Sequence, residues 1–342
     1  MTAFPWEAEA NFAAEPAENS VQPQTVAAID CGTNSIRLLI LRRENGIIRE
    51  LLRDMVIVRL GEGVDETRRL SPVAIARTVA AAKQYAQVCV EHQVTKLRFV
   101  ATSASRDAQN SADFTTAIRD AIGVEPEVIS GDAEARFSFL GAVGSLSEVA
   151  FPALVVDIGG GSTEFVVGAL DARREVQIQA AYSADMGSVR LTEKFPGFTA
   201  ETDTFEYREA VETAAAWVGE YLDEVSQHVS FNQLQSLIGV AGTVTTVTAK
   251  ALDLTEYEPA KIHNARLSFA RQQQAVDYMV SAPVQQKQAL AYMPAGRADV
   301  IAAGSVIWAE IMRRVQEANP ALTQVITSEQ DILDGVALSL LP

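Results

Sequence analysis

The stretch Val26-Ala-Ala-Ile-Asp-Cys-Gly-Thr-Asn-Ser-Ile-Arg-Leu-Leu-Ile-Leu41 decides the fold, because the chain repeats its pattern at Leu154-Val-Val-Asp-Ile-Gly-Gly-Gly-Ser-Thr-Glu-Phe-Val-Val-Gly168. Each copy reads as an apolar strand, an aspartate, a glycine-containing turn with hydroxyl or amide side chains, and a second apolar strand. This pattern predicts two β-hairpins. Two copies in one chain predict two domains that begin with the same supersecondary unit.

The tips of both hairpins have the composition of a phosphate-binding loop. Residues without Cβ let successive backbone N–H groups converge on an anion. A lone glycine-rich turn is as often only a turn, but two matched copies and a third Gly-Thr turn after another apolar strand favour binding. The expected phosphate-binding residues are Asp30, Gly32, Thr33, Asn34 and Ser35 in the first tip, Gly159, Gly160, Gly161, Ser162 and Thr163 in the second, and Gly242 and Thr243 in the third turn. Asp157 can also hold a cation, directly or through water.

The length of 342 residues favours two domains. We expect an acidic, disordered leader over residues 1–24, which contains Glu but no Lys or Arg. We place the first domain at 25–140 and the second at 141–342, because residues 141–152 are rich in Gly and Ser and weakly periodic. The last helix either belongs to the second domain or packs back on the first.

Between the hairpins, predicted helices and strands alternate, as in α/β folds. Ser71-Pro72 predicts a helix start with Ser71 as the cap, and Gly123 predicts a helix end. Another helix opens at Gly131-Asp-Ala-Glu-Ala-Arg136, with Asp132 as its N-cap and Glu134 in its first turn. Further predicted elements are strands at 96–102, from 236 and at 324–327, a long helix at 206–228 and a closing helix.

The composition argues against several functional classes. A net charge of −16 argues against nucleic acid as a partner, and no apolar run reaches the roughly 20 residues that span a bilayer. Two isolated cysteines indicate a reducing, cytoplasmic setting. The histidines are too scattered for a zinc site. A polyanionic ligand would therefore have to be bound by backbone amides, a few Arg or Lys side chains and a divalent metal.

Six motifs together resemble the exopolyphosphatase and guanosine pentaphosphate phosphohydrolase family of the actin-like ATPase superfamily. The motifs occur in the same order as in that family and cover roughly residues 25–340. The whole set is more specific evidence than any single loop. The motifs are Asp30-Cys-Gly-Thr-Asn-Ser-Ile-Arg37, Ala101-Thr-Ser-Ala-Ser-Arg106, Ile129-Ser-Gly-Asp-Ala-Glu-Ala-Arg136, Asp157-Ile-Gly-Gly-Gly-Ser-Thr-Glu164, Gly187-Ser-Val-Arg-Leu-Thr-Glu193 and Gly296-Arg-Ala-Asp-Val-Ile301.

The resemblance implies an α/β fold with two actin-like (ribonuclease H-like) domains, each a mixed sheet flanked by helices, around a central cleft. It implies hydrolysis of a terminal phosphoanhydride with Mg²⁺ or Mn²⁺. Glu134 matches the general base, Arg106 matches a phosphate-contacting arginine, and Asp157 and Glu164 belong to the second phosphate loop. We expect both of these carboxylates at the metal, although Glu164 could instead only orient Arg106. The chain departs from the family at Asp132-Ala133, where long members often have a second glutamate.

We therefore expect an exopolyphosphatase that releases orthophosphate from inorganic polyphosphate. We expect a short form without the additional helical domains of long members, which favours shorter substrates. Alternatives are hydrolysis of guanosine pentaphosphate, an actin-like kinase, or a phosphate-ligand sensor without catalysis. Apolar helices in the second domain and the habit of the family suggest a homodimer.

Several single residues keep two interpretations. Arg37 either serves the first loop or pairs with a surface acid. Arg190 and Arg297 either serve the site or form ion pairs that hold loops together. We expect Cys31 to pack under the first loop rather than to act as a nucleophile. The first helical turn favours the anion of Glu134, whereas neighbouring carboxylates would raise its pKa.

Overall fold

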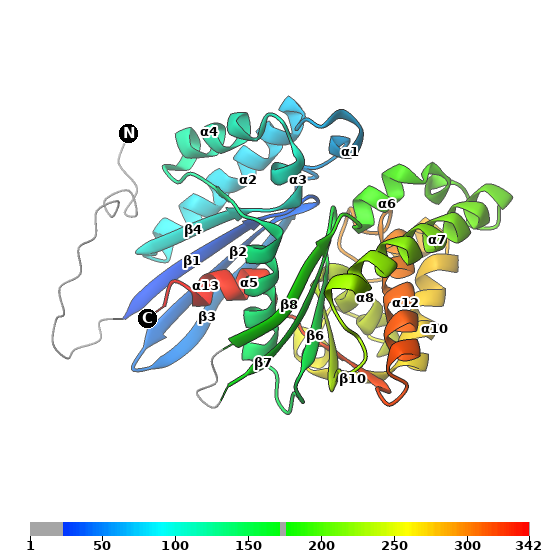
Figure 1. The fold of residues 1–342 in the computed structure, drawn as a ribbon. Coiled ribbons are helices and arrows are strands. Elements are labelled where there is room, and N and C mark those ends of the chain that lie inside the picture. Colours follow the sequence, from blue (N-terminus) through cyan, green and yellow to red (C-terminus); the bar gives the residue numbers. More distant parts are fainter. Residues whose placement is uncertain (1–22, 172–175, 342) are drawn as a thin grey trace. The chain divides into compact units, whose positions relative to one another are not determined.

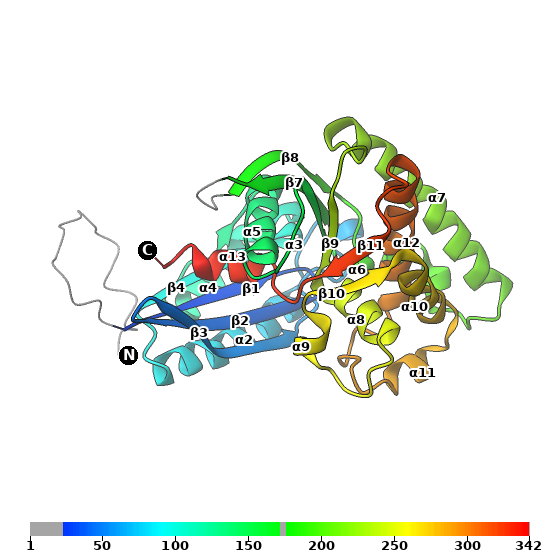
Figure 2. The same ribbon diagram turned by 90° about the horizontal axis from the view of Figure 1, so that it is seen from below.

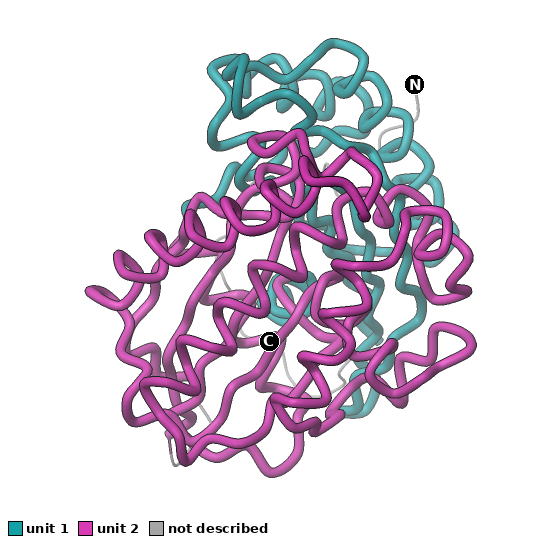
Figure 3. Tube along the Cα trace, turned by 90° about the vertical axis from the view of Figure 1, so that its right-hand side faces the viewer, with its two compact units in different colours: residues 1–130, 333–342 teal, residues 131–332 magenta. Residues whose placement is uncertain are grey.

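The computed structural model describes residues 23–171 and 176–341, which form two compact units. The first unit runs to Ser130 and includes the residues from Leu333 onward, and the second unit is Gly131–Ile332 (Figure 3). The division thus falls after residue 130, whereas the sequence suggested a boundary after 140. The expected acidic leader, 1–24, lies almost entirely outside the described residues.

The first unit is built on a five-stranded mixed sheet with the order β3-β2-β1-β4-β5 (Figure 1). The first three strands form an antiparallel meander, and β4 and β5 continue the sheet in parallel with β1. The strands are β1 (Gln24–Cys31), β2 (Ser35–Glu44), β3 (Ile47–Ile57), β4 (Lys96–Ala101) and β5 (Glu127–Val128). The predicted first hairpin is therefore β1–β2.

Helices α2 and α4 cover one face of this sheet, where alternate residues of β1 and β2 join their apolar side chains in one core. The hydroxyl of Ser71 accepts a hydrogen bond from the N–H of Ala74, with Pro72 in the first turn, and α4 ends at Gly123 with φ 73°. The predicted cap and helix end are confirmed. The helices of this region are α1 (Val64–Thr67), α2 (Pro72–Glu91), α3 (Ser103–Asp107) and α4 (Ser111–Ile122).

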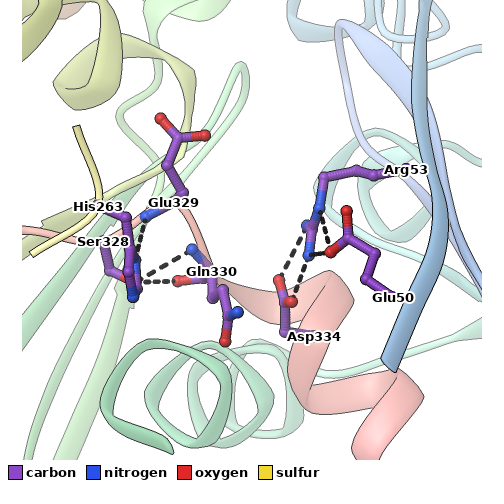
Figure 4. A network of polar contacts seen from close by, with 7 residues as sticks. All are labelled: Glu50, Arg53, His263, Ser328, Glu329, Gln330 and Asp334. Carbon is purple, nitrogen blue, oxygen red and sulfur yellow. Dashed lines mark hydrogen bonds and ion pairs between the residues drawn. The ribbon is translucent and has the colours of Figure 1, made fainter. Parts of the chain in front are cut away.

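The last helix of the chain, α13 (Ile332–Leu338), packs on the first unit. Both Nη atoms of Arg53 donate to the carboxylate of Asp334, at 3.1 and 2.5 Å, while Arg53 also donates to Glu50 (Figure 4). Arg53 alternates with Leu52, which contacts the core under α2. The ion pair therefore attaches α13 to the other face of the sheet.

The second unit is built on a six-stranded mixed sheet with the order β10-β11-β9-β6-β7-β8 (Figures 1 and 2). Strands β6, β7 and β8 form an antiparallel meander, β9 and β11 run parallel to β6, and β10 is antiparallel to β11. The strands are β6 (Ala153–Ile158), β7 (Thr163–Leu170), β8 (Val176–Ala184), β9 (Ser236–Val240), β10 (Ala265–Ser268) and β11 (Gln324–Thr327).

Two helical layers cover the two faces of this sheet. Helix α5 (Gly131–Gly144) lies on one face, where its apolar residues join Val155, Val166 and Ile238. The other face packs against the larger core of the unit. The helices of that layer are α6 (Ser188–Lys194), α7 (Phe205–His228), α8 (Ala241–Ala251), α10 (Phe269–Ser281) and α12 (Ile301–Ala318), with the short η2 (Pro196–Thr199), α9 (Pro259–Ile262) and α11 (Val284–Gln288) at their ends.

The segment that follows β11 is fixed by local polar contacts within the second unit. Nδ1 of His263 accepts a hydrogen bond from the N–H of Glu329 at 3.3 Å. The hydroxyl of Ser328 both donates to the carbonyl of Gln330, at 2.8 Å, and accepts from its N–H, at 3.0 Å (Figure 4). These contacts order the chain just before it returns to the first unit.

The two sheets share one topology. The order β3-β2-β1-β4-β5 of the first unit corresponds strand for strand to β8-β7-β6-β9-β11 of the second, which adds β10 at its edge. Each unit is thus a mixed sheet flanked by helices, and this part of the expected α/β fold is confirmed. Among the described residues, no helix is long and apolar enough to cross a bilayer.

Candidate active site

Three polar side chains form a row across the second sheet at the carboxyl end of β6. Asp157 pairs with Glu164 across the β6–β7 hairpin, and Glu164 pairs with Ser183 on β8. Side chains alternate between the faces of a sheet, so Asp157 lies on the face of Val155, which packs against α5. Directly paired residues of an antiparallel sheet share a face. All three side chains therefore project toward α5.

Helix α5 brings Glu134 to the same face. The helix begins at Gly131, one residue before the expected cap, so the assignment of Asp132 as N-cap is wrong: Asp132 and Glu134 both lie in the first turn. Glu134 is buried, and Ser138, one turn later, donates its hydroxyl hydrogen to Oδ2 of Asp157 at 2.6 Å. Glu134 therefore belongs to the same unit as Asp157, although the sequence placed the two in different domains.

Glu164 shows the electrostatic consequence of this grouping. Burial raises the pKa of Glu164 well above its usual value, and the negative charges of Glu134 and Asp157 raise it further. Hydrogen bonds from Ser162 and Ser183 oppose this rise in pKa, and the Ser183 hydroxyl lies 2.8 Å from Oε1. The structure thus brings three predicted site carboxylates into one electrostatically interacting group.

The second glycine turn bonds residues 188–190 through its carbonyl groups, so its N–H groups point away from that segment. The N–H of Gly159 donates to the carbonyl of Ser162 at 3.0 Å, which closes a two-residue turn. In a trans peptide the carbonyl and the next N–H point in opposite directions, so the N–H groups of residues 160–162 face away from 188–190. The contacts that fix the carbonyls are Ser188 N–H to Gly159 (3.0 Å), Val189 N–H to Gly160 (2.8 Å) and Arg190 Nε to Gly161 (2.7 Å).

A close approach of glycine makes this arrangement possible. A Cβ atom on Gly187 would lie only 2.4 Å from the carbonyl carbon and oxygen of Gly160 and 2.5 Å from the nitrogen of Gly161. Only a residue without a side chain fits there. Arg190 is buried against the same turn, so it holds the loop through a backbone carbonyl.

The first unit uses the same device at its own hairpin tip. The N–H of Gly32 donates to the carbonyl of Ser35 at 3.0 Å, as Gly159 does in the second unit. The carbonyls of Thr33 and Asn34 accept hydrogen bonds from the segment that follows β3, and the hydroxyls of Thr33 and Ser103 share a hydrogen bond of 3.0 Å. The N–H groups of Asn34 and Ser35 consequently face away from that segment.

In the first sheet, the position that corresponds to Glu164 is occupied by a residue of opposite charge, Arg37. Asp30 pairs across β1–β2 with Arg37, whose Nη2 lies 2.6 Å from Oδ2 of Asp30. The acid that Arg37 contacts is thus Asp30, a buried residue of the first loop rather than a surface acid, so this ion pair holds Arg37 at that loop. The Cys31 thiol is fully buried, and burial followed by the charge of Asp30 raises its pKa, as expected for packing under the loop.

The remaining predicted site residues are divided between the units. In the second unit, α8 begins at the third turn, where Gly242 contacts the guanidinium of Arg297 and Thr243 is buried. Nη1 of Arg297 also donates to the hydroxyl of Thr246 at 3.1 Å, so Arg297 holds the start of α8. In the first unit, Nη1 of Arg106 donates to the carbonyl of Ile129 at 3.3 Å.

The donor set suits a divalent cation whose coordination is completed by water, and by phosphate once substrate is bound. In the described ranges, no three His, Cys, Asp or Glu side chains group closely enough to hold a metal ion by themselves. Asp157 and Glu164 are adjacent, buried oxygen donors. Mg²⁺ is commonly held by one or two carboxylates, substrate phosphates and water, so this pair fits that ion.

Comparisons with known proteins identify relatives over nearly the whole chain. A model of the Ppx/GppA phosphatase family matches residues 39–342. Exopolyphosphatase 2 of Mycobacterium tuberculosis is 43% identical over 324 residues, which cover 92% of this chain and 98% of the relative. The crystal structure of an exopolyphosphatase-like protein is 40% identical, with a TM-score of 0.85 and coverage of 93% of this chain and 98% of that one. The Ppx/GppA family member from Aquifex aeolicus is 29% identical, with a TM-score of 0.75 and coverage of 94% and 98%.

Proposed function

We propose that this chain, which belongs to the Ppx/GppA phosphatase family, is an exopolyphosphatase. It would hydrolyse the terminal phosphoanhydride of inorganic polyphosphate, preferably of shorter chains, and release orthophosphate. The observation that carries this proposal is the buried group of Glu134, Asp157 and Glu164 beside a loop whose amides face outward. The similarity to a relative named exopolyphosphatase 2 supports the choice of substrate.

In this proposal each group has one task in phosphoryl transfer to water. The N–H groups of residues 160–162 bind oxygens of the terminal phosphate, and Glu134 accepts the proton of the attacking water. Asp157 and Glu164 hold Mg²⁺ or Mn²⁺, which when bound neutralises charge on the phosphate oxygens. Burial makes these contacts stronger than they would be in water.

The outward amides and the carboxylates have complementary roles toward a polyanion. The chain carries a net charge of −16, so substrate attraction must come from local groups rather than from the protein as a whole. Turn amides supply positive dipoles, and a divalent cation offsets the negative charges of Asp157 and Glu164. Further assigned phosphate-binding residues are Asp30, Gly32, Thr33, Asn34, Ser35 and Arg106 in the first unit, and Gly159, Thr163, Gly242 and Thr243 in the second.

Two properties of the whole protein belong to the same proposal. We assign it to the cytoplasm because Cys31 and Cys89 are both free and buried. We also propose a homodimer, which light scattering of the purified protein tests directly: a mass near the 36.8 kDa of one chain would contradict it.

The proposed activity is tested by measuring orthophosphate release in the presence of Mg²⁺. The substrates are polyphosphates of short and long chain length, guanosine pentaphosphate and ATP, with a chelator as the control. We expect release from polyphosphate, fastest from the shorter chains, and none with chelator. Release from guanosine pentaphosphate alone would replace exopolyphosphatase by guanosine pentaphosphate phosphohydrolase, and release from none would contradict a hydrolase.

A further inference from the structure

Ser138 links the helix that carries Glu134 to the carboxylate that follows β6. Residues four apart in a helix share a face, so Glu134 and Ser138 project from α5 in the same direction. The Ser138 side chain is fully buried, and its hydroxyl donates to Oδ2 of Asp157 at 2.6 Å. This is the short distance of a hydrogen bond from a hydroxyl to a charged carboxylate, which is stronger than a bond between neutral groups.

We propose that Ser138 is a positioning residue that holds the Asp157 carboxylate in the orientation required to bind a divalent cation. This inference rests on the proposed function, in which Asp157 and Glu164 hold that cation. A carboxylate that can rotate must be ordered when the ion binds, whereas one fixed by a buried hydroxyl is already ordered. Hydrogen-bonding partners of metal ligands typically change metal affinity 10–100-fold when they are removed.

Glu164 is held in the same manner from the opposite side, which supports the assignment. The hydroxyl of Ser183 donates to Oε1 of Glu164 at 2.8 Å. Ser183 in turn touches the start of α5, because a Cβ atom on Gly131 would lie 2.6 Å from the Cβ of Ser183. Helix α5 thus contacts Asp157 through its own residue Ser138. It reaches Glu164 indirectly, because it touches Ser183 of β8, which donates to Glu164. The position of one helix therefore sets the orientation of both carboxylates.

The test measures binding of Mn²⁺ alone, without substrate, by isothermal titration calorimetry on the full chain. In Ser138→Ala we expect the Mn²⁺ dissociation constant to rise about 10–100-fold. The matched control is Ser305→Ala in α12, which also removes a fully buried hydroxyl. Within the described part of the chain, Oγ of Ser305 has no hydrogen-bond partner. The control should leave the Mn²⁺ dissociation constant unchanged.

Two further substitutions separate positioning from packing. Ser138→Cys keeps nearly the same volume but offers only a weak donor, so it should lose Mn²⁺ affinity as Ser138→Ala does. Ser138→Thr keeps the hydroxyl and should bind Mn²⁺ within about threefold of the unaltered protein. In activity assays, Ser138→Ala should need more Mn²⁺ for half-maximal rate but approach the normal kcat at saturating Mn²⁺. A purely structural role would instead lower kcat and the thermal unfolding midpoint together.

Two results would overturn the inference. One is an unchanged Mn²⁺ dissociation constant in both Ser138→Ala and Ser138→Cys, with thermal unfolding showing that either variant is folded. The other is the absence of Mn²⁺ binding by the unaltered protein. Because this titration contains no phosphate, its result is independent of the substrate panel. A protein that binds Mn²⁺ as expected but hydrolyses no substrate would contradict the proposed function and not this inference.

Discussion

Asp157 and Glu164 face each other across the β6–β7 hairpin, so two carboxylates occupy one buried cross-strand pair. Like charges in directly opposite positions destabilise a sheet. The corresponding pair in the first unit joins an aspartate to Arg37, which neutralises it. The second hairpin therefore retains an unfavourable pair where the first has a stabilising one, and a cation bound at this pair would relieve the repulsion.

Replacing Glu164 by Gln should stabilise the metal-free protein, and increasingly so as the pH rises. The pKa of Glu164 is higher in the folded than in the unfolded chain. Above the unfolded value the native state therefore binds more protons, and the free energy of unfolding falls with rising pH. Glu164→Gln has no titrating carboxyl at this position, so this fall in the free energy of unfolding should disappear. Thermal unfolding in chelator across pH 4–8 measures it, with exposed Glu209→Gln of α7 as the control. A variant that is less stable than the parent at pH 8 would contradict the expectation.

Replacing Gly187 by Ala should displace the second phosphate loop. The new Cβ would meet the Gly160 peptide at 2.4 Å, and overpacking of this kind costs roughly 1–3 kcal/mol. Misplacement of the loop by about 1 Å can reduce the rate on the order of 100-fold. Phosphate release and urea unfolding report the two effects. Gly219→Ala in α7, where no atom beyond the adjacent residues and the helix's own backbone lies within 4 Å of the new Cβ, should keep full activity. Equal activity and equal stability of the two variants would contradict the role of Gly187 in positioning the loop.

Replacing Lys287 by Met should stabilise the protein at neutral pH. The side chain is buried, its Nζ donates to the carbonyl of Met279 at 3.2 Å, and burial lowers its pKa from 10.5 to about 8. Between these pH values the unfolded chain binds the extra proton, so the stability of the parent should rise by about 3 kcal/mol. In Lys287→Met, the free energy of unfolding should no longer rise between these pH values, and at pH 7 it should exceed that of the parent by roughly 1–3 kcal/mol. Urea unfolding at pH 7 and pH 10 checks both values, and parallel profiles for parent and variant would refute this role of burial.

The two hairpins could be predicted from sequence because their information is local. Apolar runs on either side of a glycine turn define both strands, and a two-residue turn fixes their register. That register already pairs Asp157 with Glu164, since the two residues are equally distant from the turn. The pairing was therefore available from the sequence, although we assigned both residues to the metal from composition and from the resemblance.

The grouping of Glu134 with these carboxylates could not be predicted in the same way. It depends on which unit α5 packs against, and this is decided by apolar contacts with β6, β7 and β8 that are distant in sequence. From the sequence we predict no strand over β8, so the hydroxyl of Ser183 is not among the expected site residues. Even with that strand, the β7–β8 pairing contains a register irregularity between Val167 and Gly168. An irregularity of this kind shifts which residues face each other.

Ser138 and Gly187 each had a signal in the sequence: helical spacing for Ser138, and a family motif for Gly187. Ser138 follows Glu134 by four residues, so a helical reading could have placed it on the same face, but its contact with Asp157 needs the tertiary structure. Gly187 begins one of the six motifs that carry the resemblance to the family. Its close approach to the second loop explains in physical terms why glycine begins that motif.

The most direct test of the account compares orthophosphate release from polyphosphate by the parent protein, Glu134→Gln and Asp132→Asn. Both substitutions remove one carboxylate from the first turn of α5, but Glu134 is buried beside the carboxylate group and Asp132 is exposed. We expect Glu134→Gln to lose at least about 100-fold in rate, as for a general base, and Asp132→Asn to remain within about threefold. Full activity in Glu134→Gln, with Mg²⁺ saturating, would contradict the assignment of catalysis to this group.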